Sequence, residues 1–217
     1  MNTYLLAFLC MAVMLVLNLL RCRKYELSAP KAVILSFAIG IMGMIGTYIM
    51  FFIENGNWGG QSFFGAVLFF PILLWPVSVV AHMKLSQLLD YATPPGMAML
   101  VLFKLNCYLV GCCSGIVLYH SEEGIPYFFP SQIVEMLVAF LLVAILIYLE
   151  KRSVFRGKIY PVCIIAYGTI RFVLNFFRWN QNDFLFGMPA GNLWSIVSVV
   201  LGVLLLLFMR KNNKCIT

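Results

Sequence analysis

Three cations of the sequence stand inside long apolar segments or at the outer ends of such segments: Lys104, Arg171 and Arg178. A cation at the centre of a lipid bilayer costs roughly 2.5–3.5 kcal/mol on insertion scales, so such residues usually face a polar cavity and mark function. A carboxylate, Glu135, lies about a turn and a half into another apolar segment. Cations and a carboxylate at a similar depth favour a site for an anionic ligand.

The segment around Arg171 carries its polar side chains on one face. At about 100° per residue, four residues fall within about 80° of one another on a helix: Tyr167, Arg171, Asn175 and Arg178. Gln132 and Glu135, three residues apart, share a face of the preceding segment. These groups could also be interhelical contacts or side chains that reach the membrane interface. Their common depth favours a binding site.

A phosphate group suits this set of side chains. Arginine offers a planar fork of donors to phosphate oxygens, whereas lysine acts as a point charge. We predict that five residues bind the phosphate of a phospholipid: Lys104, Arg171, Arg178, Gln132 and Asn175. Glu135 would either orient Arg171 or act as a base, and the sequence leaves both roles open.

Three of the seven cysteines lie close together in the sequence: Cys107, Cys112 and Cys113. The chain has no CxxC pair, and we expect neither a metal ion nor a cofactor. Cys107 or Cys112 could form a covalent intermediate, because Lys104, one turn before Cys107, would lower the pKa of that thiol. Alternatively, the small thiols only allow close packing beside Gly111. A thiol–disulfide oxidoreductase is a further alternative, which the missing CxxC pair disfavours.

The elements that must position these residues are predicted to be membrane helices. The 217 residues are 63% hydrophobic and 11% charged, with a mean hydropathy of +0.96, whereas a soluble domain is roughly 25% charged. A helix needs about 20 apolar residues to cross the hydrocarbon core, and seven stretches meet or approach that length: 3–20, 31–53, 61–81, 88–111, 130–149, 159–177 and 191–209. We therefore expect an all-α integral membrane protein with about seven transmembrane helices. Residues 1–217 would form a single transmembrane domain without a sizeable soluble head.

The basic residues predict the orientation. Twelve of the fifteen Lys and Arg residues lie between alternate stretches or after the last one: Arg21, Arg23, Lys24, Lys31, Lys84, Lys151, Arg152, Arg156, Lys158, Arg210, Lys211 and Lys214. By the positive-inside rule, the N-terminus is outside and the C-terminus is cytoplasmic. The candidate site then lies toward the outer leaflet. Since the net charge of +7 resides at helix ends, we expect no nucleic-acid partner.

Four segments resemble the motifs of the prolipoprotein diacylglyceryl transferase family, in the family's order. Residues 59–65 (GGQSFFG) are similar to GG-x-S-F-H-G, and residues 103–111 (FKLNCYLVG) align with G-R-x-G-N-F-x-N-G. Residues 130–135 (PSQIVE) resemble the end of H-P-S-Q-x-x-E, and residues 167–178 (YGTIRFVLNFFR) resemble Y-G-x-x-R-x-x-x-E-F-x-R. One such match alone would be weak, but four in register are specific.

The departures from these motifs are concentrated at the candidate site. Phe64 and Phe129 replace family histidines, Lys104 replaces an arginine, Cys107 replaces an asparagine, and Cys112 and Asn175 replace glutamates. The soluble head that follows the second motif in the family is reduced here to a short loop between residues 115 and 130. The phosphate-binding cations are thus retained, while the acid–base and peptide-reading positions are altered.

The resemblance implies a bacterial inner-membrane enzyme that moves a diacylglyceryl group from phosphatidylglycerol to the thiol of a lipobox cysteine. Phosphatidylglycerol and the lipobox peptide of a prolipoprotein would be its partners. Arg171, Glu135, Tyr167, Cys107 and Cys112 are the candidate catalytic residues. With the family histidine absent, Tyr167 or Glu135 could accept the thiol proton, or positive potential alone could suffice. The alternative is a phospholipid-binding relative without catalytic activity.

Overall fold

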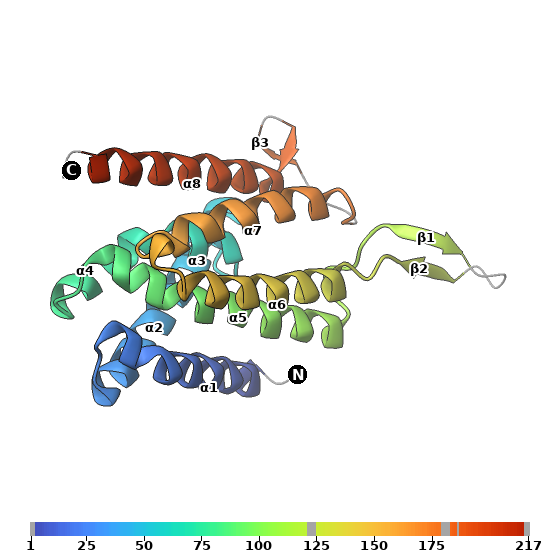
Figure 1. Cartoon of the computed structure of the whole chain (residues 1–217). Helices are drawn as coiled ribbons and strands as arrows, with labels where there is room; N and C mark the ends of the chain where they lie inside the picture. Colours follow the sequence, from blue (N-terminus) through green and yellow to red (C-terminus); the bar gives the residue numbers. More distant parts are fainter. Residues whose placement is uncertain (1–2, 121–124, 179–182, 186, 215–217) are drawn as a thin grey trace.

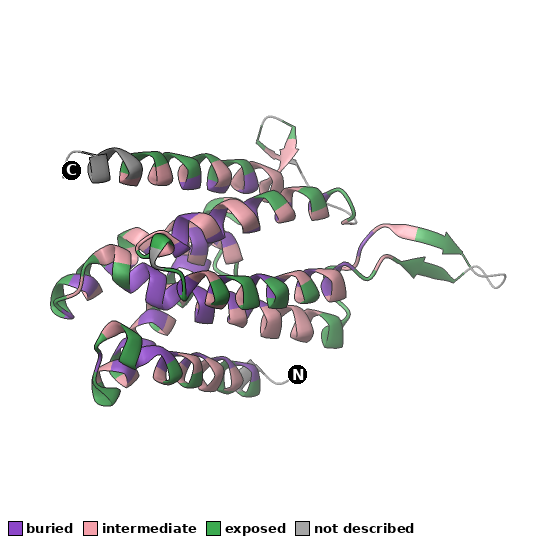
Figure 2. Cartoon of the chain, viewed as in Figure 1, coloured by how far each residue is buried: buried purple, intermediate pink, exposed green. Residues whose placement is uncertain are grey.

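The computed structural model describes residues 3–120, 125–178, 183–185 and 187–214 (Figure 1). Most of the described residues are helical, in the order α1 (Thr3–Arg21), η1 (Cys22–Tyr25), α2 (Ala29–Asn55), α3 (Phe63–Leu68), α4 (Phe70–Val80), α5 (Leu85–Val110), α6 (Ser131–Glu150), η2 (Ser153–Phe155), α7 (Ile159–Asn175) and α8 (Ala190–Lys214). Helix α5 packs on α1, α4, α6 and α7, and α7 packs on α8. The buried residues concentrate where these helices meet (Figure 2).

The described residues confirm a mostly helical chain with several candidate membrane spans, but they do not confirm the predicted number of about seven. Four helical segments among the described residues are long and apolar enough to cross a membrane: Leu5–Tyr25, Ala29–Asn55, Ser131–Glu150 and Ala190–Met209. A fifth span results if α4 and α5 count as one, although they bend by 119° at the break between them, and α7 is a shorter apolar helix. The predicted stretch 61–81 is two helices, with α3 ending at Leu68 and α4 beginning at Phe70. Pro71 in the first turn of α4 fits this interruption, because proline is tolerated where no helical N–H bond is needed.

Glycine allows the closest helix contact near the first motif. A Cβ atom on Gly65 of α3 would lie 1.9 Å from the carbonyl oxygen of Gly46 in α2, a distance at which any side chain would clash. The backbone N–H of Ser62 also donates a 3.1 Å hydrogen bond to the carbonyl of Thr47. Residues 59–65 therefore allow the start of α3 to pack directly against the backbone of α2.

The all-α prediction omits two short antiparallel hairpins. Strands β1 (Val117–His120) and β2 (Pro126–Phe128) project from one end of the bundle (Figure 1), and β3 (Asp183–Leu185) pairs with β4 (Met188–Pro189). The β1–β2 hairpin replaces the predicted short loop, and its tip, residues 121–124, lies outside the described residues. Tyr119 and Tyr127 stack across the pair with ring centroids 4.7 Å apart, a cross-strand contact that stabilises a hairpin.

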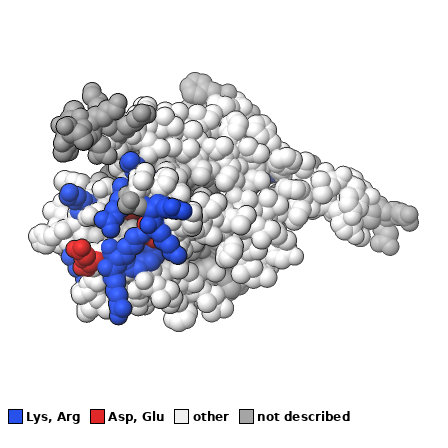
Figure 3. All heavy atoms as spheres, viewed as in Figure 1, with Lys and Arg blue, Asp and Glu red and all other residues white. Residues whose placement is uncertain are grey.

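Basic side chains gather at the end of the bundle opposite this hairpin (Figure 3). Helices α1 and α6 end there, and α2, α5 and α7 begin there, each beside one or more of the basic residues used to predict the orientation. The side chains of Arg210, Lys211 and Lys214 lie outside the description of α8. The basic residues that alternate with the apolar stretches in the sequence therefore lie together at one end of the folded bundle.

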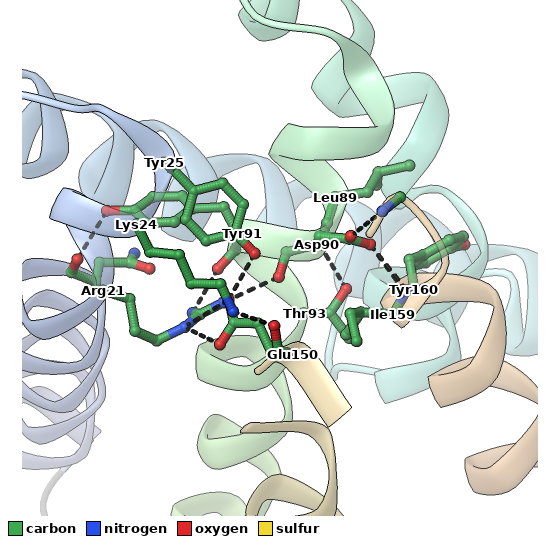
Figure 4. A network of polar contacts seen from close by, with 12 residues as sticks. Arg21, Lys24, Tyr25, Leu89, Asp90, Tyr91, Thr93, Glu150, Ile159 and Tyr160 are labelled. Atoms are coloured by element: carbon green, nitrogen blue, oxygen red, sulfur yellow. Dashed lines mark hydrogen bonds and ion pairs between the residues drawn. The ribbon is translucent and has the colours of Figure 1, made fainter. Parts of the chain in front are cut away.

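One of the basic residues used to predict the orientation is buried in the bundle. Arg21 is 8% exposed and forms a buried ion pair with Glu150 at the end of α6, with 2.6 Å between Nη2 and Oε1 (Figure 4). Its Nη1 also donates to the carbonyl of Tyr91 at 2.8 Å, and its Nη2 to the carbonyl of Asp90 at 3.0 Å. Those two carbonyls lack helical partners, because the residues four positions later are prolines without an N–H. Arg21 therefore supplies the hydrogen bonds that the two carbonyls lose because of the prolines in α5.

The Asp90 carboxylate fixes the start of α7 at the same level of the bundle. It accepts hydrogen bonds from the backbone N–H groups of Gly157 at 2.5 Å and of Ile159 at 2.9 Å (Figure 4). A carboxylate at a helix N-terminus satisfies free N–H groups and complements the helix dipole. The contacts of Arg21 and Asp90 therefore link α1, α5, α6 and α7 at this end of the bundle.

Candidate functional site

A buried charged cluster joins the three central helices. Lys104 of α5 and Arg171 of α7 form ion pairs with the two carboxylate oxygens of Glu135 of α6. The side chains are 12%, 9% and 6% exposed, respectively. Two cations share one carboxylate, so the cluster keeps one positive charge in excess. The Nε atom of Arg171 is buried and has no hydrogen-bond partner within the described part of the chain.

The polar face predicted for α7 is buried. Tyr167 and Asn175, one turn to either side of Arg171, are 7% and 2% exposed. Tyr167 packs edge-on against Phe63, with 5.4 Å between ring centroids, and its ring also contacts Phe64. A cavity of about 10 Å³ is lined by Glu135, Tyr167 and Arg171, which is space for about one water molecule.

A larger apolar cavity lies beside the charged cluster. Its volume is about 270 Å³, and it is lined by side chains of α1, α2, α3, α5 and α7. Phe63 and Phe103 form part of the wall. Phe63 packs on Tyr167, and Phe103 directly precedes Lys104. The apolar cavity and the charged cluster are therefore neighbours across these two aromatic side chains.

Comparison with known proteins assigns the family. The profile of prolipoprotein diacylglyceryl transferase matches residues 2–208. The chain belongs to the prolipoprotein diacylglyceryl transferase family. It is 25% identical over 166 residues to the phosphatidylglycerol–prolipoprotein diacylglyceryl transferase of Dehalococcoides mccartyi, covering 71% of this chain and 64% of that protein.

Two further relatives carry the same name. The protein of Tropheryma whipplei is 27% identical over 164 residues, covering 68% of this chain and 60% of the relative. The protein of Clostridium tetani is 22% identical over 195 residues, covering 77% and 78%. The alignment thus spans under two thirds of the Dehalococcoides and Tropheryma proteins and more than three quarters of the Clostridium protein.

Two of the predicted phosphate ligands have other contacts in this structure. The amide Nε2 of Gln132 donates a 2.6 Å hydrogen bond to the carbonyl of Cys112. Arg178, just beyond α7, is half-buried and pairs through its backbone with Gly115, while its charge acts on Glu135 and on Cys113. Gln132 thus supports the backbone of the cysteine turn, and both phosphate-binding roles stay predictions.

The three clustered cysteines converge at the C-terminal end of α5. The sulfur atoms of Cys107, Cys112 and Cys113 all lie within 4.8 Å of one another. A hydrogen bond from Cys107, together with the positive charges of Arg178 and Lys104, lowers the pKa of the Cys113 thiol to about 5. Of the three thiols, Cys113 is thus the one whose pKa its neighbours lower, whereas the sequence predicts the nucleophile at Cys107 or Cys112. The roles predicted for those two residues stay predictions.

A second carboxylate near the cluster was not among the predicted site residues. Glu54 at the end of α2 accepts a 2.9 Å hydrogen bond from Ser62 of the first motif, and the charge of Arg171 acts on it. Its position one residue before the helix end at Asn55 made it resemble an ordinary acidic loop residue. The Gly-Gly-x-Ser motif was the signal that could have indicated it.

Proposed function

We propose that this protein transfers a diacylglyceryl group from phosphatidylglycerol to a cysteine thiol of a prolipoprotein. The observation that carries the proposal is the buried Lys104–Glu135–Arg171 cluster, whose excess positive charge would be offset by the phosphate of a lipid. The names of the relatives support the donor and the acceptor. Burial of two cations beside one carboxylate is costly unless a further anion compensates them.

The chemistry requires stabilisation of a leaving phosphate. The acceptor thiolate attacks the glyceryl carbon that bears the phosphate ester; the carbon–sulfur bond forms, the carbon–oxygen bond breaks, and glycerol phosphate leaves. Negative charge grows on the departing phosphate, and preorganised donors that face it lower the barrier. Arg171 and Lys104 would supply these donors; the Nε of Arg171, which has no partner among the described residues, would be available to the ligand. Glu135 would hold both cations in position.

The apolar cavity would bind an acyl chain of the phosphatidylglycerol donor. Its wall is built from aliphatic, methionine and aromatic side chains, with a few polar groups such as Thr47 and Gln61. Gly43 of α2 lines it, and among the described residues outside its own helix backbone and chain neighbours no heavy atom lies within 4 Å of the position of a Cβ. A side chain introduced at residue 43 therefore has room to enter the cavity without displacing the backbone.

We expect the purified chain in lipid bilayers to move diacylglyceryl from phosphatidylglycerol to a cysteine-containing lipobox peptide, and Gly43→Phe to impair this. Filling the cavity should lower kcat/KM about tenfold with long-chain donors, because the phenyl ring takes space that an acyl chain would occupy; a tenfold loss corresponds to about 1.4 kcal/mol. Short-chain phosphatidylglycerol should restore most of the rate. Mass spectrometry of the peptide measures the transfer.

Ile34→Phe is the matched control, because Ile34 is on the same helix with its side chain 69% exposed. It should leave the rate unchanged for both donors. A wild-type protein that binds phosphatidylglycerol but modifies no thiol would overturn the enzyme proposal. If Gly43→Phe lowers kcat/KM equally for short-chain and long-chain donors, the cavity does not bind the acyl chain.

Binding without catalysis is the second candidate. Two of the departures from the family motifs favour it, because Phe64 and Phe129 stand in place of histidines. Phe64 is 4% exposed and packs on Tyr167, and Phe129 packs on Phe177 with ring centroids 5.4 Å apart. Aromatic packing thus replaces two titratable groups beside the cations. Phospholipid binding with no transfer to any thiol would support this reading.

We also propose that the chain crosses the bacterial inner membrane about seven times, with the site open to the outer leaflet. The gathering of cations at one end of the bundle supports this orientation. In spheroplasts, a membrane-impermeant maleimide should label a variant whose only cysteine is Cys112, which is exposed at the opposite end. A variant whose only cysteine is introduced by Arg152→Cys should stay unlabelled until the membrane is lysed. The reverse pattern would invert the topology; Cys215 itself lies outside the described residues.

A further inference from the structure

The turn after α5 brings three thiols together by means of specific contacts. Gly111 ends the helix with a positive φ of 75°, and the N–H of Cys112 returns to the carbonyl of Cys107 at 3.0 Å. Cys113 itself has a φ of 61°, which is a strained conformation for a residue with a side chain. The chain thus folds back so that residues 112 and 113 lie over the last turn of α5.

Two side chains of α6 stabilise this turn by hydrogen bonds to its backbone. Ser131 donates to the carbonyl of Cys113 at 2.7 Å, and Gln132 donates to the carbonyl of Cys112 at 2.6 Å. Both donors are buried, at 1% and 6% exposure. The two carbonyls are therefore held by α6, and the thiols are left free to face one another.

The spacing of the sulfur atoms fits a shared metal ion. All three lie within 4.8 Å of one another, and thiolates bound to one tetrahedral zinc ion at about 2.3 Å each are separated by about 3.8 Å. The sulfur atoms are thus at most about 1 Å farther apart than in such a site. Cys112 and Cys113 are exposed and Cys107 is half-buried, so an ion can reach the site.

The surroundings suit a cluster of three thiolates with one open position. The positive charges of Lys104 and Arg178 act on the cysteine group, so they offset the negative charge that three thiolates leave on a monovalent or divalent ion. The described residues offer no fourth cysteine, histidine or carboxylate at the cluster. Zinc sites with three protein ligands keep their fourth position for water or substrate.

We propose that Cys107, Cys112 and Cys113 bind a thiophilic d¹⁰ metal ion, Zn²⁺ or Cu⁺, and that its open position takes the thiol of the acceptor. This rests on the proposed transfer from phosphatidylglycerol. A thiol that coordinates the ion loses its proton to solvent, and the resulting thiolate attacks the glyceryl carbon while glycerol phosphate departs toward Lys104 and Arg171. The metal would thus provide the thiol activation for which the family histidines are missing.

Metal content tests the site without reference to activity. The whole chain, purified under reducing conditions and equilibrated with Zn²⁺, should retain stoichiometric zinc after dialysis, and the triple variant Cys107→Ser/Cys112→Ser/Cys113→Ser should retain none. The matched control is Cys10→Ala/Cys22→Ala/Cys163→Ala, which removes three buried cysteines elsewhere and should keep the zinc. Because triple variants can fail to fold, the exposed single change Cys112→Ser is measured as well, and should weaken zinc retention at least tenfold. A parallel anaerobic titration with Cu⁺ shows which of the two ions is held more tightly.

Cobalt substitution tests the open position. Co²⁺ bound by thiolates gives intense charge-transfer absorption, and adding a lipobox-type peptide should increase that absorption, whereas the same peptide with serine for cysteine should not. Zinc retention equal in the wild type and in Cys112→Ser would overturn the site, as would recovery of the three cysteines as a disulfide and a free thiol with no bound metal. An unchanged cobalt spectrum with the cysteine peptide would overturn acceptor binding. If metal binds as expected but no diacylglyceryl is transferred, the proposed function fails while the metal site stands.

Discussion

Arg171→Ala should lower lipid transfer by about two to three orders of magnitude, the range measured when one preorganised donor to a developing oxyanion is removed. Arg171 is 8% exposed and shares Glu135 with Lys104. In the variant, the carboxylate keeps Lys104 as its partner, so no buried charge loses its last counterion. The protein should therefore still insert and fold, and the loss should appear in kcat with phosphatidylglycerol as donor.

Two further variants test whether the shape of the Arg171 guanidinium matters as well as its charge, and whether the effect is specific to this site. Arg171→Lys should recover only part of the rate, since a point charge cannot reproduce the planar fork of donors. Arg152→Ala removes an exposed arginine at the opposite end of the bundle, where the guanidinium contacts Tyr148, and should leave transfer unchanged. Wild-type transfer by Arg171→Ala would exclude the cluster as the phosphate site. Full recovery by Arg171→Lys would mean that charge alone suffices.

The convergence of Lys104, Glu135 and Arg171 could be predicted from the sequence for a physical reason. Charges within apolar stretches have few stable environments, so each must find an opposite charge or a polar cavity. The helical period then placed Tyr167 and Asn175 on the same face as Arg171, and that face is buried. What each side chain does to a substrate does not follow from burial, and those roles stay predictions.

The burial of Arg21 could not be predicted from the sequence. It follows an apolar stretch and precedes further basic residues, which is the pattern of a membrane-surface cation. Its actual partners, Glu150 and the carbonyls beside the two prolines of α5, are more than 60 residues away in the chain. No local pattern encodes such a contact. The signal available in the sequence was the proline pair inside a predicted span, which frees two carbonyls that some donor must satisfy.

The cysteine turn was beyond prediction for another reason. Spacing indicated that Cys107 lies one turn after Lys104, but the side on which Cys112 and Cys113 emerge depends on the left-handed conformations of Gly111 and Cys113. Glycine at a helix end made the first of these plausible. The second is unfavourable for cysteine in isolation and depends on the contacts that α6 provides.

Arg21→Ala should lower the free energy of unfolding by about 3–5 kcal/mol, the cost of breaking a buried ion pair by removal of one partner. The change leaves the Glu150 carboxylate without its guanidinium; Tyr25 still donates to that carboxylate at 2.5 Å, whereas Lys24 donates to the backbone carbonyl of Glu150. Thermal unfolding in detergent measures the effect. Arg23→Ala is the matched control, because Arg23 is an exposed cation two residues away and should change the stability by less than about 0.5 kcal/mol. Equal stability of the two variants would show that the Arg21 contacts contribute nothing net.

A double-mutant cycle isolates the part of this effect that comes from the proline break. In Pro94→Ala/Pro95→Ala, the new N–H groups can donate to the carbonyls of Asp90 and Tyr91, which Arg21 otherwise satisfies. Arg21→Ala should therefore cost less in that background, by about 1–3 kcal/mol for each carbonyl that would otherwise be buried without a partner. An equal cost in both backgrounds would assign the stabilisation to Glu150 alone. A reduced cost would mean that an arginine at the end of α1 is what permits two prolines in the helix that carries Lys104.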